Sequence, residues 1–524
     1  MFELIVTLVI ASLPLYLIVS ALISGYAPFS RFRDKVVKTV PVFMISLCAV
    51  SLIVLGILYS SGQHTYTALV RITPVSAVVL TLVVILGAVI SRFSQRYMMA
   101  EACYPTFVRW LHNLLAAVLI TVVANHLLIF FAGWVAISLC LHRLLVLYPE
   151  RSRALLAARK KFLMARSSEL LLAVAFIALY VNTGSAYIGE INTTLAESAD
   201  STSPLMLMSA ICIASAALLK CAQLPFHGWL IQVVEVPTPV SALLHAGIIN
   251  LGGYLLILFA PLMSLYAAAN WMILVFAGLS LVFASLVMTT RVTVKVKLAW
   301  STSAQMSLML IQCALGLYSF ALLHMVAHSL YKSYCFLSAG QTVQRSVTTE
   351  FANKQPSSLA DWLNATLVSL VITLSTVYFF AENEPVTPWL VLFLSLSTLL
   401  AVRFAPSDQS HFYVWILTAF GLALCYGLMK SLFTMLQPNM NQVTAGSAMD
   451  IWVIGLLSFM FVLHLWLERS PTGKWAEAIK AQLFGGLFLD EWFTRATLTI
   501  WPASSGLKPG KQTTPNNATT SIRR

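Results

Sequence analysis

Long apolar segments recur along almost the whole chain and constrain its fold more than any other sequence feature. A helix that crosses the hydrocarbon core of a bilayer needs about 20 apolar residues, and we count about fifteen segments of that size. Their approximate limits are 2–24, 37–60, 70–91, 105–124, 126–147, 167–189, 204–224, 240–260, 271–290, 296–316, 317–341, 361–381, 388–403, 411–436 and 450–468. The sequence therefore predicts an all-α polytopic membrane protein with about 14 to 15 transmembrane helices in residues 1–468.

The composition agrees with a membrane protein and excludes several other classes. Hydrophobic residues make up 59% of the 524 residues and charged residues only 10%, whereas a soluble domain has about 25% charged residues. The net charge of +13 does not indicate nucleic-acid binding, because the basic residues lie in short clusters between apolar segments. The eight cysteines form no CxxC pair, so the sequence predicts no metal, iron–sulfur cluster or other cofactor in this chain.

The positions of the basic clusters predict the orientation in the membrane. With the N-terminus outside, the cytoplasmic loops carry most of the Lys and Arg residues between segments, including six in residues 151–166. The opposite loops carry few basic residues and hold polar, acidic stretches such as 189–204. The sequence therefore predicts an outside N-terminus and a cytoplasmic C-terminus.

Two segments follow the last predicted transmembrane helix. Residues 469–502 mix charged residues with Leu, Phe and Trp, which predicts a cytoplasmic amphipathic segment that lies on the membrane or docks a soluble partner. Residues 503–524 are rich in Ser, Thr, Asn, Pro, Gly and Lys, and we expect them to be disordered.

Ionisable residues inside apolar segments mark the candidate functional site, since each costs about 2.5–3.5 kcal/mol to place near the bilayer centre. Lys220 lies near the end of the segment at 204–224, and Pro225 follows it. Proline cannot continue a helical hydrogen-bond ladder, so the helix should break beside Lys220, as helices do at transporter binding sites. A desolvated lysine there could release and rebind a proton; the alternative is a lysine whose ammonium group extends to the membrane surface.

Histidines supply further candidates in two other segments. A helix that begins at the prolines at 237 and 239 carries His245. His324, His328 and Lys332 follow one another at a spacing of four, which places them on one stripe of a helix, a geometry suited to passing a proton. The alternative for each is a buried polar group bonded to a neighbouring helix. Two histidines four apart would also fit zinc, but no carboxylate or cysteine joins them at ligand spacing.

A buried lysine needs a counter-charge, and the sequence offers two carboxylates. Glu169 opens the sixth apolar segment and is the best intramembrane candidate, while Glu235 precedes the helix of His245. His142 and Arg143 in the fifth segment are weaker candidates that an interfacial charge cluster explains as well. No motif for nucleotide binding or zinc protease chemistry is present, so we expect no catalytic residue and an ion gradient or a partner as the energy source.

A family resemblance is carried by the segment LLKCAQLPFHGWLIQVVEVPTPVSALLHAGIINLGGYLL. It resembles the proton-conducting, antiporter-like membrane subunits of NADH:quinone oxidoreductase and of multisubunit cation/proton antiporters. Further similar segments are NHLLIFFAGW, VKLAWSTSAQMSLM, HMVAHSLYKSYCFLSAGQTV and FGGLFLDEWF, and the resemblance covers most of residues 90–345. It implies inverted repeats with two broken helices, with the core of the bundle at 105–403. By position, it assigns ion translocation to Lys220, His245, His324, His328 and Lys332.

Two departures limit what the resemblance implies. The related subunits have a glutamate directly after a Gly-Trp pair in the fifth segment, whereas Val135 follows that pair here. The related second broken helix carries a lysine, but nothing after residue 345 matches it, and Lys430 and Arg403 are poor substitutes by position. We therefore expect a conduit that consumes a gradient of protons or sodium ions rather than a redox-driven pump.

One branch of this family fits better, the membrane subunits of two-component inorganic carbon transporters. It implies that this chain lies in the inner membrane of a bacterial cell, in contact with membrane lipid. There it would supply cation flux to a large cytoplasmic zinc protein of the DabA type, similar to carbonic anhydrase, which captures CO2 or bicarbonate. The alternatives are a subunit of a cation/proton antiporter and a membrane subunit of an NADH:quinone oxidoreductase-like complex.

Overall fold

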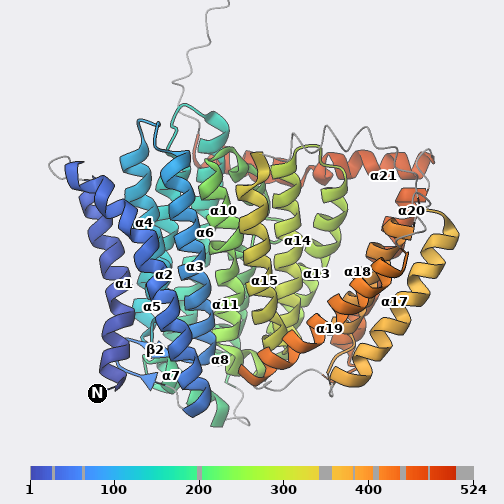
Figure 1. The fold of residues 1–524 in the computed structure, drawn as a ribbon, viewed down its shortest axis with the longest axis horizontal. Helices are drawn as coiled ribbons and strands as arrows, with labels where there is room; N and C mark the ends of the chain where they lie inside the picture. Colours follow the sequence, from blue (N-terminus) through green and yellow to red (C-terminus); the bar gives the residue numbers. More distant parts are fainter. Residues whose placement is uncertain are drawn as a thin grey trace, which may run out of the picture.

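Long helices run side by side through almost the whole molecule (Figure 1). The structure, a computed structural model, describes residues 2–25, 30–61, 65–197, 203–340, 357–381, 384–404, 412–436, 444–469 and 473–502. The tail at 503–524, which we expect to be disordered, lies outside the described residues. In the described part, ten helices are long and apolar enough to cross a membrane, and three further apolar helices are shorter. The chain is therefore a multi-pass membrane protein, as the sequence predicts.

Each apolar segment predicted from the sequence coincides with a helix or with the pieces of a broken one. The first part of the bundle contains α1 (Phe2–Gly25), α2 (Ser30–Ser61), α3 (Pro74–Tyr97), α4 (Tyr104–Val123), α5 (Leu127–Leu145), α6 (Ser152–Thr183) and α8 (Pro204–Lys220). The middle contains α9 (Gly228–Gln232), η2 (Val233–Glu235), α10 (Thr238–Ala246), η3 (Ile248–Asn250), α11 (Leu251–Leu258), α12 (Ala260–Leu265), α13 (Ala267–Thr289), α14 (Val294–Ala314) and α15 (Tyr318–Leu337). The last part contains α17 (Leu359–Phe380), α18 (Thr387–Phe404), α19 (Phe412–Leu436) and α20 (Ala448–Arg469).

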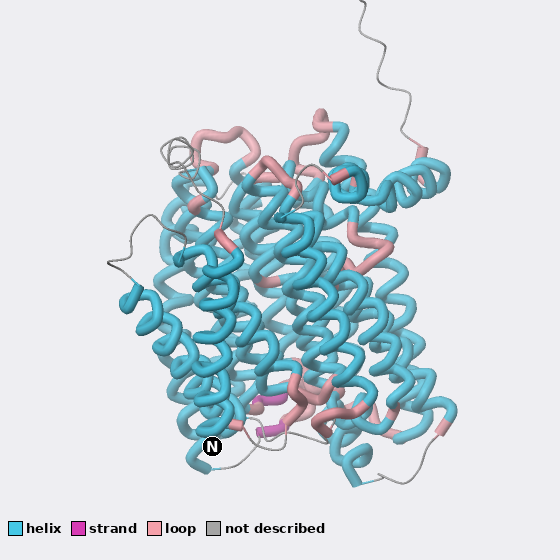
Figure 2. Tube along the Cα trace, turned by 90° about the vertical axis from the view of Figure 1, so that its right-hand side faces the viewer, coloured by secondary structure: helices cyan, strands magenta, loops and turns pink. Residues whose placement is uncertain are grey.

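Two small elements differ from the sequence-based expectation. The connection between α2 and α3 contains a short antiparallel pair of strands, β1 (Thr65–Tyr66) and β2 (Arg71–Ile72), beside the all-α bundle that the sequence predicts and the structure confirms. Figure 2 shows the strands at the end of the bundle where the chain begins. The stretch at 189–204, expected as a polar loop, starts with helix α7 (Ile188–Glu197). α7 buries its apolar positions, among them Ile191 and Leu195, which explains why a helix forms there.

The chain breaks two of its membrane-crossing helices in the middle of the sequence. α8 ends at Lys220 and helix resumes only with α9, because Pro225 in the connection cannot donate a backbone hydrogen bond. The second break separates α10 from α11, where Gly247 has non-helical dihedral angles of −123° and −69°. The resemblance implies the second break in the later repeat. In the described residues of that region, α17, α18, α19 and α20 are instead each a single helix.

The outer surface of the bundle is apolar, as contact with lipid requires. Leu170, Val371, Tyr378 and Phe379 are examples of exposed large hydrophobic side chains, and Tyr378 is 83% exposed. A soluble monomer rarely exposes apolar surface of this extent. The interior, by contrast, holds both the apolar core and the buried ionisable groups described below.

The C-terminal helices lie across one end of the bundle rather than within it (Figure 1). They are α21 (Lys474–Phe484), η5 (Gly486–Phe488) and α22 (Leu489–Ile500). The Arg291 Nη2 atom, in the connection between α13 and α14, donates a hydrogen bond of 2.9 Å to the Leu483 backbone oxygen and so fixes α21. Arg291 and the basic start of α6 thus lie at the end of the bundle that these helices cover.

Candidate functional site

Lys220 is the last residue of α8, at the break itself. Beyond it, Ala222 has a positive φ of 52° and the chain leaves the helical path. α11 approaches this point so closely that a Cβ on Gly252 would lie 2.5 Å from the Cys221 sulfur and 2.9 Å from the Ala217 carbonyl oxygen. The helix break that the sequence predicts beside Lys220 is therefore confirmed, and a neighbouring helix packs tightly against it.

A small cavity lies beside the Lys220 side chain, and Trp134, Ser138, Lys161 and Glu169 also line it. The Lys220 Nζ lies 4.3 Å from the centre of the Trp134 ring. The negative face of an aromatic ring attracts an ammonium group at this distance, and the attraction is stronger in a desolvated site. The cavity has about 20 Å³ of space for the centre of a water molecule, enough for about one water.

Glu169 is the carboxylate that the structure brings to Lys220. Its side chain is buried and lines the same cavity, and its Oε1 accepts a hydrogen bond of 2.7 Å from Arg166 Nη2. Glu235, the other predicted counter-charge, is not brought to the lysine. It is exposed in η2, and its carboxylate lies 3.8 Å from Arg153. Of the two predicted counter-charges, Glu169 therefore lies beside Lys220 and Glu235 does not.

His324, His328 and Lys332 lie together on α15, as the spacing predicts. The ring centres of the two histidines are 6.0 Å apart, and His328 Nε2 lies 3.3 Å from the backbone oxygen of His245. The Lys332 side chain is fully buried and donates a hydrogen bond of 2.7 Å to the Ser301 hydroxyl. The structure therefore brings four of the five predicted translocation residues into one cluster, between α10, α14 and α15.

His245 is buried against this stripe with its ring stacked on Phe336, at 4.5 Å between ring centres. Neither ring nitrogen has a hydrogen-bond partner within the described ranges. Buried polar groups are normally paired with protein or with ordered water. We therefore expect water at this imidazole, which would let it pass a proton.

Buried amides link the break at Lys220 to the helices of the stripe, and sequence reasoning missed them. Gln223 Oε1, just after the break, accepts a hydrogen bond of 2.7 Å from the Ser307 hydroxyl of α14. Asn250, at the second break, donates a hydrogen bond of 2.7 Å from its Nδ2 to the Ser329 hydroxyl of α15. Gln223 and Asn250 could have been found in the sequence, because each is an amide side chain within an otherwise apolar segment.

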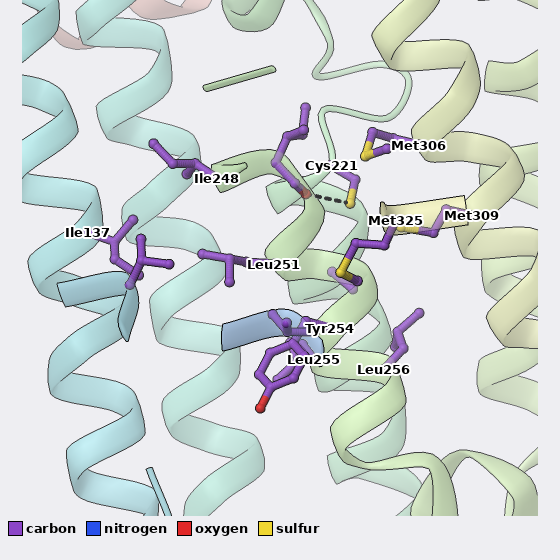
Figure 3. Packing of buried hydrophobic residues seen from close by; sticks show 14 of the residues in the cluster. Ile137, Cys221, Ile248, Leu251, Tyr254, Leu255, Leu256, Met306, Met309 and Met325 are labelled. Atoms are coloured by element: carbon purple, nitrogen blue, oxygen red, sulfur yellow. Dashed lines mark hydrogen bonds between the residues drawn. The ribbon is translucent and has the colours of Figure 1, made fainter. Parts of the chain in front are cut away.

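Buried apolar side chains pack around α11 (Figure 3). Met306 and Met309 of α14 and Met325 of α15 are buried beside α11, and Cys221 donates a hydrogen bond to the Ile249 backbone oxygen. Close apolar packing of this kind excludes bulk water. The arrangement suits transfer of a proton between separate groups rather than free diffusion of hydrated ions.

Lys430 is a further buried lysine, in α19, and the structure gives it a partner. It forms an ion pair with Glu384, which precedes α18, and both side chains are nearly inaccessible at 2% and 1% exposure. Its Nζ also donates a hydrogen bond of 2.8 Å to the Phe380 backbone oxygen. The sequence shows a lysine in an apolar segment and an acidic residue in a loop, but not that they meet.

The C-terminal helix α22 packs directly on the first break. The Asp490 Oδ1 accepts a hydrogen bond of 2.7 Å from Lys160 Nζ, and its Oδ2 accepts one of 2.6 Å from Gln232 Nε2 of α9. Gly228 leaves the space for this carboxylate, because a Cβ there would overlap Asp490 Oδ1. Displacement of α22 would therefore disturb the segment that follows Lys220.

The described residues contain no group of three or more His, Cys, Asp or Glu side chains that could hold a metal ion. The eight cysteines are all free thiols. The chemistry that the site offers is therefore that of amines, imidazoles and a carboxylate, all groups that can carry protons.

Comparisons with known proteins identify the family. The family described as "NADH:quinone oxidoreductase/Mrp antiporter, TM" matches residues 124–381. The "Probable inorganic carbon transporter subunit DabB" of Hydrogenovibrio crunogenus is 42% identical over 435 residues, which is 83% of each protein. The "Probable inorganic carbon transporter subunit DabB2" of Halothiobacillus neapolitanus is 31% identical over 84% of this chain and 82% of its own length.

A solved structure shares the fold. The "Structure of Mrp complex from Dietzia sp. DQ12-45-1b" contains a chain that superposes with a TM-score of 0.63 at 19% sequence identity. The match covers 94% of this chain and 59% of that chain, so this chain spans less than two thirds of its length. Sequence and fold agree, and the chain belongs to the NADH:quinone oxidoreductase/Mrp antiporter family of membrane proteins.

Proposed function

We propose that this chain is the cation-conducting membrane subunit of an inorganic carbon transporter. It lets protons run down their gradient and so energises uptake of CO2 or bicarbonate by a cytoplasmic partner. The single observation that carries the conduit is the series of ionisable groups inside the bundle, from Glu169 and Lys220 at the cavity to His328 and Lys332 on α15. The substrate class is supported by the names of the relatives, which are described as inorganic carbon transporter subunits.

Protons fit this series better than sodium ions do. Hard cations such as sodium need several oxygen ligands, preferably carboxylates. The cavity at Lys220 offers one carboxylate, Glu169, and three cationic side chains lie at or beside it, Lys161, Arg166 and Lys220. Such a site repels a metal cation, whereas a proton is bound by the amine itself.

The membrane potential supplies the driving force in this proposal. Moving one elementary charge through a potential of 100 mV releases about 2.3 kcal/mol, enough to bias an uptake step by tens of fold. The sequence holds no nucleotide-binding motif, so an ion gradient is the energy source that its residues can use. A subunit of a cation/proton antiporter is the alternative function, and a subunit of an NADH:quinone oxidoreductase-like complex is the second.

The partner in this proposal is a large cytoplasmic zinc protein of the DabA type, and it docks on α21 and α22. The N-terminus lies outside and the C-terminus in the cytoplasm, because the end covered by these helices carries Lys160, Arg159 and Arg291. The outer side of α21 and α22 presents Trp475 and Trp492, at 79% and 60% exposure. Exposed tryptophans of this kind are enriched in protein interfaces and at membrane surfaces.

Copurification tests the proposed partner. The tagged chain, extracted in mild detergent, is expected to bring down one large soluble protein together with zinc. Uptake of labelled bicarbonate by cells carrying both proteins is expected to collapse on addition of a protonophore. A set of small membrane subunits would instead support the antiporter, and flavin or iron–sulfur proteins the respiratory complex.

Asp490 gives a sharper test of the dock. In Asp490→Asn the buried Lys160 loses its carboxylate, and α22 loosens from the break. We expect labelled bicarbonate uptake to fall about tenfold, as for the loss of one charge-assisted hydrogen bond, with the chain still in the membrane. Glu491→Gln is the matched control, since Glu491 is exposed and pairs only with Arg495 in the described part of the chain. Equal uptake in the two variants would exclude a role for this contact.

A further inference from the structure

Lys161 is a buried lysine that neither the sequence motifs nor the family resemblance single out. It lies on α6, its side chain is 5% exposed, and it lines the cavity of Lys220 and Glu169. Its Nζ donates a hydrogen bond of 2.6 Å to the Ser138 backbone oxygen and one of 3.2 Å to the Ser138 hydroxyl. Within the described ranges Lys161 forms no ion pair, and the carboxylate of its cavity pairs with Arg166 instead.

The cavity and its rim contain more positive than negative groups. Arg166 donates hydrogen bonds to Glu169 at 2.7 Å and to Ser138 Oγ at 3.0 Å, so the single carboxylate is already held by a guanidinium group. The Glu169 carboxylate therefore only partly neutralises Lys161 and Lys220. Two ammonium ions in one desolvated cavity repel each other strongly, so a second proton on this pair is disfavoured. A proton that reaches one lysine therefore favours release from the other.

The two lysines also lie at different depths. Ser168 of α6 bonds to the Ala216 backbone oxygen, and Ser209 of α8 bonds to the Ala175 backbone oxygen. The two helices therefore run antiparallel, and Lys220 lies level with about position 164, roughly 4.5 Å along the axis of α6 from Lys161. Lys161 is thus nearer to the end of the bundle where α6 begins and α22 packs. His142 of α5 lies close to Lys161 on this side, and its Nδ1 has no hydrogen-bond partner among the described residues.

We infer that Lys161 is a second proton-carrying residue, placed between Lys220 and the end of the bundle that α22 covers. This inference rests on the proposed function. A water molecule in the cavity takes a proton from the Lys220 ammonium as it gives its own proton to the Lys161 amine, so one N–H bond breaks and another forms. Arrival of the next proton at Lys220 then drives the proton on Lys161 toward the end of the bundle that α22 covers.

The competing interpretation is that Lys161 only holds α5 to α6 through Ser138. Arginine separates the two, because it donates the same hydrogen bonds but does not release its proton. The test uses proton flux in lipid vesicles that contain the purified chain, with an imposed pH gradient and potential. Lys161→Arg and Lys161→Gln are both expected to lower the flux about a hundredfold or more. Arg153→Lys is the matched control, at an exposed position of the same helix outside the cavity and the contact with α22, and keeps the flux.

Lys161→His provides a second, independent readout. An imidazole takes and releases protons, so this variant is expected to keep part of the flux, with its pH profile moved to lower pH. The charged and titratable groups around position 161 are Cys140 and His142 of α5, Arg166 and Glu169 of α6 and Lys220 of α8. Wild-type flux in Lys161→Arg, or equal flux in Lys161→His and Lys161→Gln, would overturn the inference. If Lys161→Arg fails to fold, the comparison of flux in Lys161→His and Lys161→Gln still separates the two interpretations.

The outcome for Lys161 is distinguishable from that for the proposed function. If the wild-type chain carries no proton flux and protonophores leave uptake unchanged, the conduit itself is wrong. If Lys220→Ala abolishes the flux while Lys161→Arg is indistinguishable from wild type, the conduit stands and only the second carrier is wrong.

Discussion

Replacing Lys220 by alanine is expected to reduce partner-dependent uptake of inorganic carbon to the level of cells without the chain. Lys220 is the ionisable group at the helix break, it lines the cavity of Glu169, and its Nζ lies over the Trp134 ring. Its removal interrupts the series of proton carriers between that cavity and α15. Lys332→Ala is expected to have the same effect, since its ammonium group is buried on the stripe of His324 and His328.

The measurement is uptake of labelled bicarbonate, with the amount of chain in the membrane determined by immunoblot. Lys35→Ala is the matched control, because this exposed lysine lies on α2, outside both the cavity and the proposed docking surface. Uptake at the wild-type level in both Lys220→Ala and Lys332→Ala would contradict a proton conduit through these residues. Loss of the protein from the membrane would be separated from loss of function by the immunoblot.

Local signals in the sequence predict much of this site. Pro225 after Lys220 predicts the break, because the missing N–H acts within a few residues of the chain. The spacing of His324, His328 and Lys332 predicts the stripe, because helical periodicity is also local. The transmembrane segments are predicted for the same reason, since each needs only its own apolar length.

Contacts between distant segments are what the sequence does not reveal. Lys161 belongs to a basic cluster that the positive-inside rule already explains, so its burial in the cavity gives no separate sequence signal. Asp490 meets Lys160 across 330 residues, and only the fold places α22 on the break. Closeness in sequence can also mislead. Glu235 lies ten residues before His245, but its carboxylate lies near Arg153 and not beside Lys220 or Lys332.

The buried pair of Glu384 and Lys430 leads to the largest expected effect on stability. Both side chains are almost fully enclosed, and Lys430 Nζ also bonds to the Phe380 backbone oxygen at 2.8 Å. Removing one partner leaves an uncompensated charge in a region of low dielectric constant. Glu384→Gln is therefore expected to destabilise the folded chain by about 3–5 kcal/mol, seen as a lower melting temperature in detergent.

A double variant separates the charge from the packing. In Glu384→Gln combined with Lys430→Met no charge remains in the site, and the volume of both side chains is nearly kept. The melting temperature is therefore expected to recover most of the loss, because an apolar replacement of a buried ion pair is often neutral or better. Glu477→Gln, at an exposed position of α21, is the control and should leave the melting temperature unchanged. A double variant as unstable as the single one would mean that the hydrogen bonds around the pair, rather than its charges, hold α19 against the end of α17.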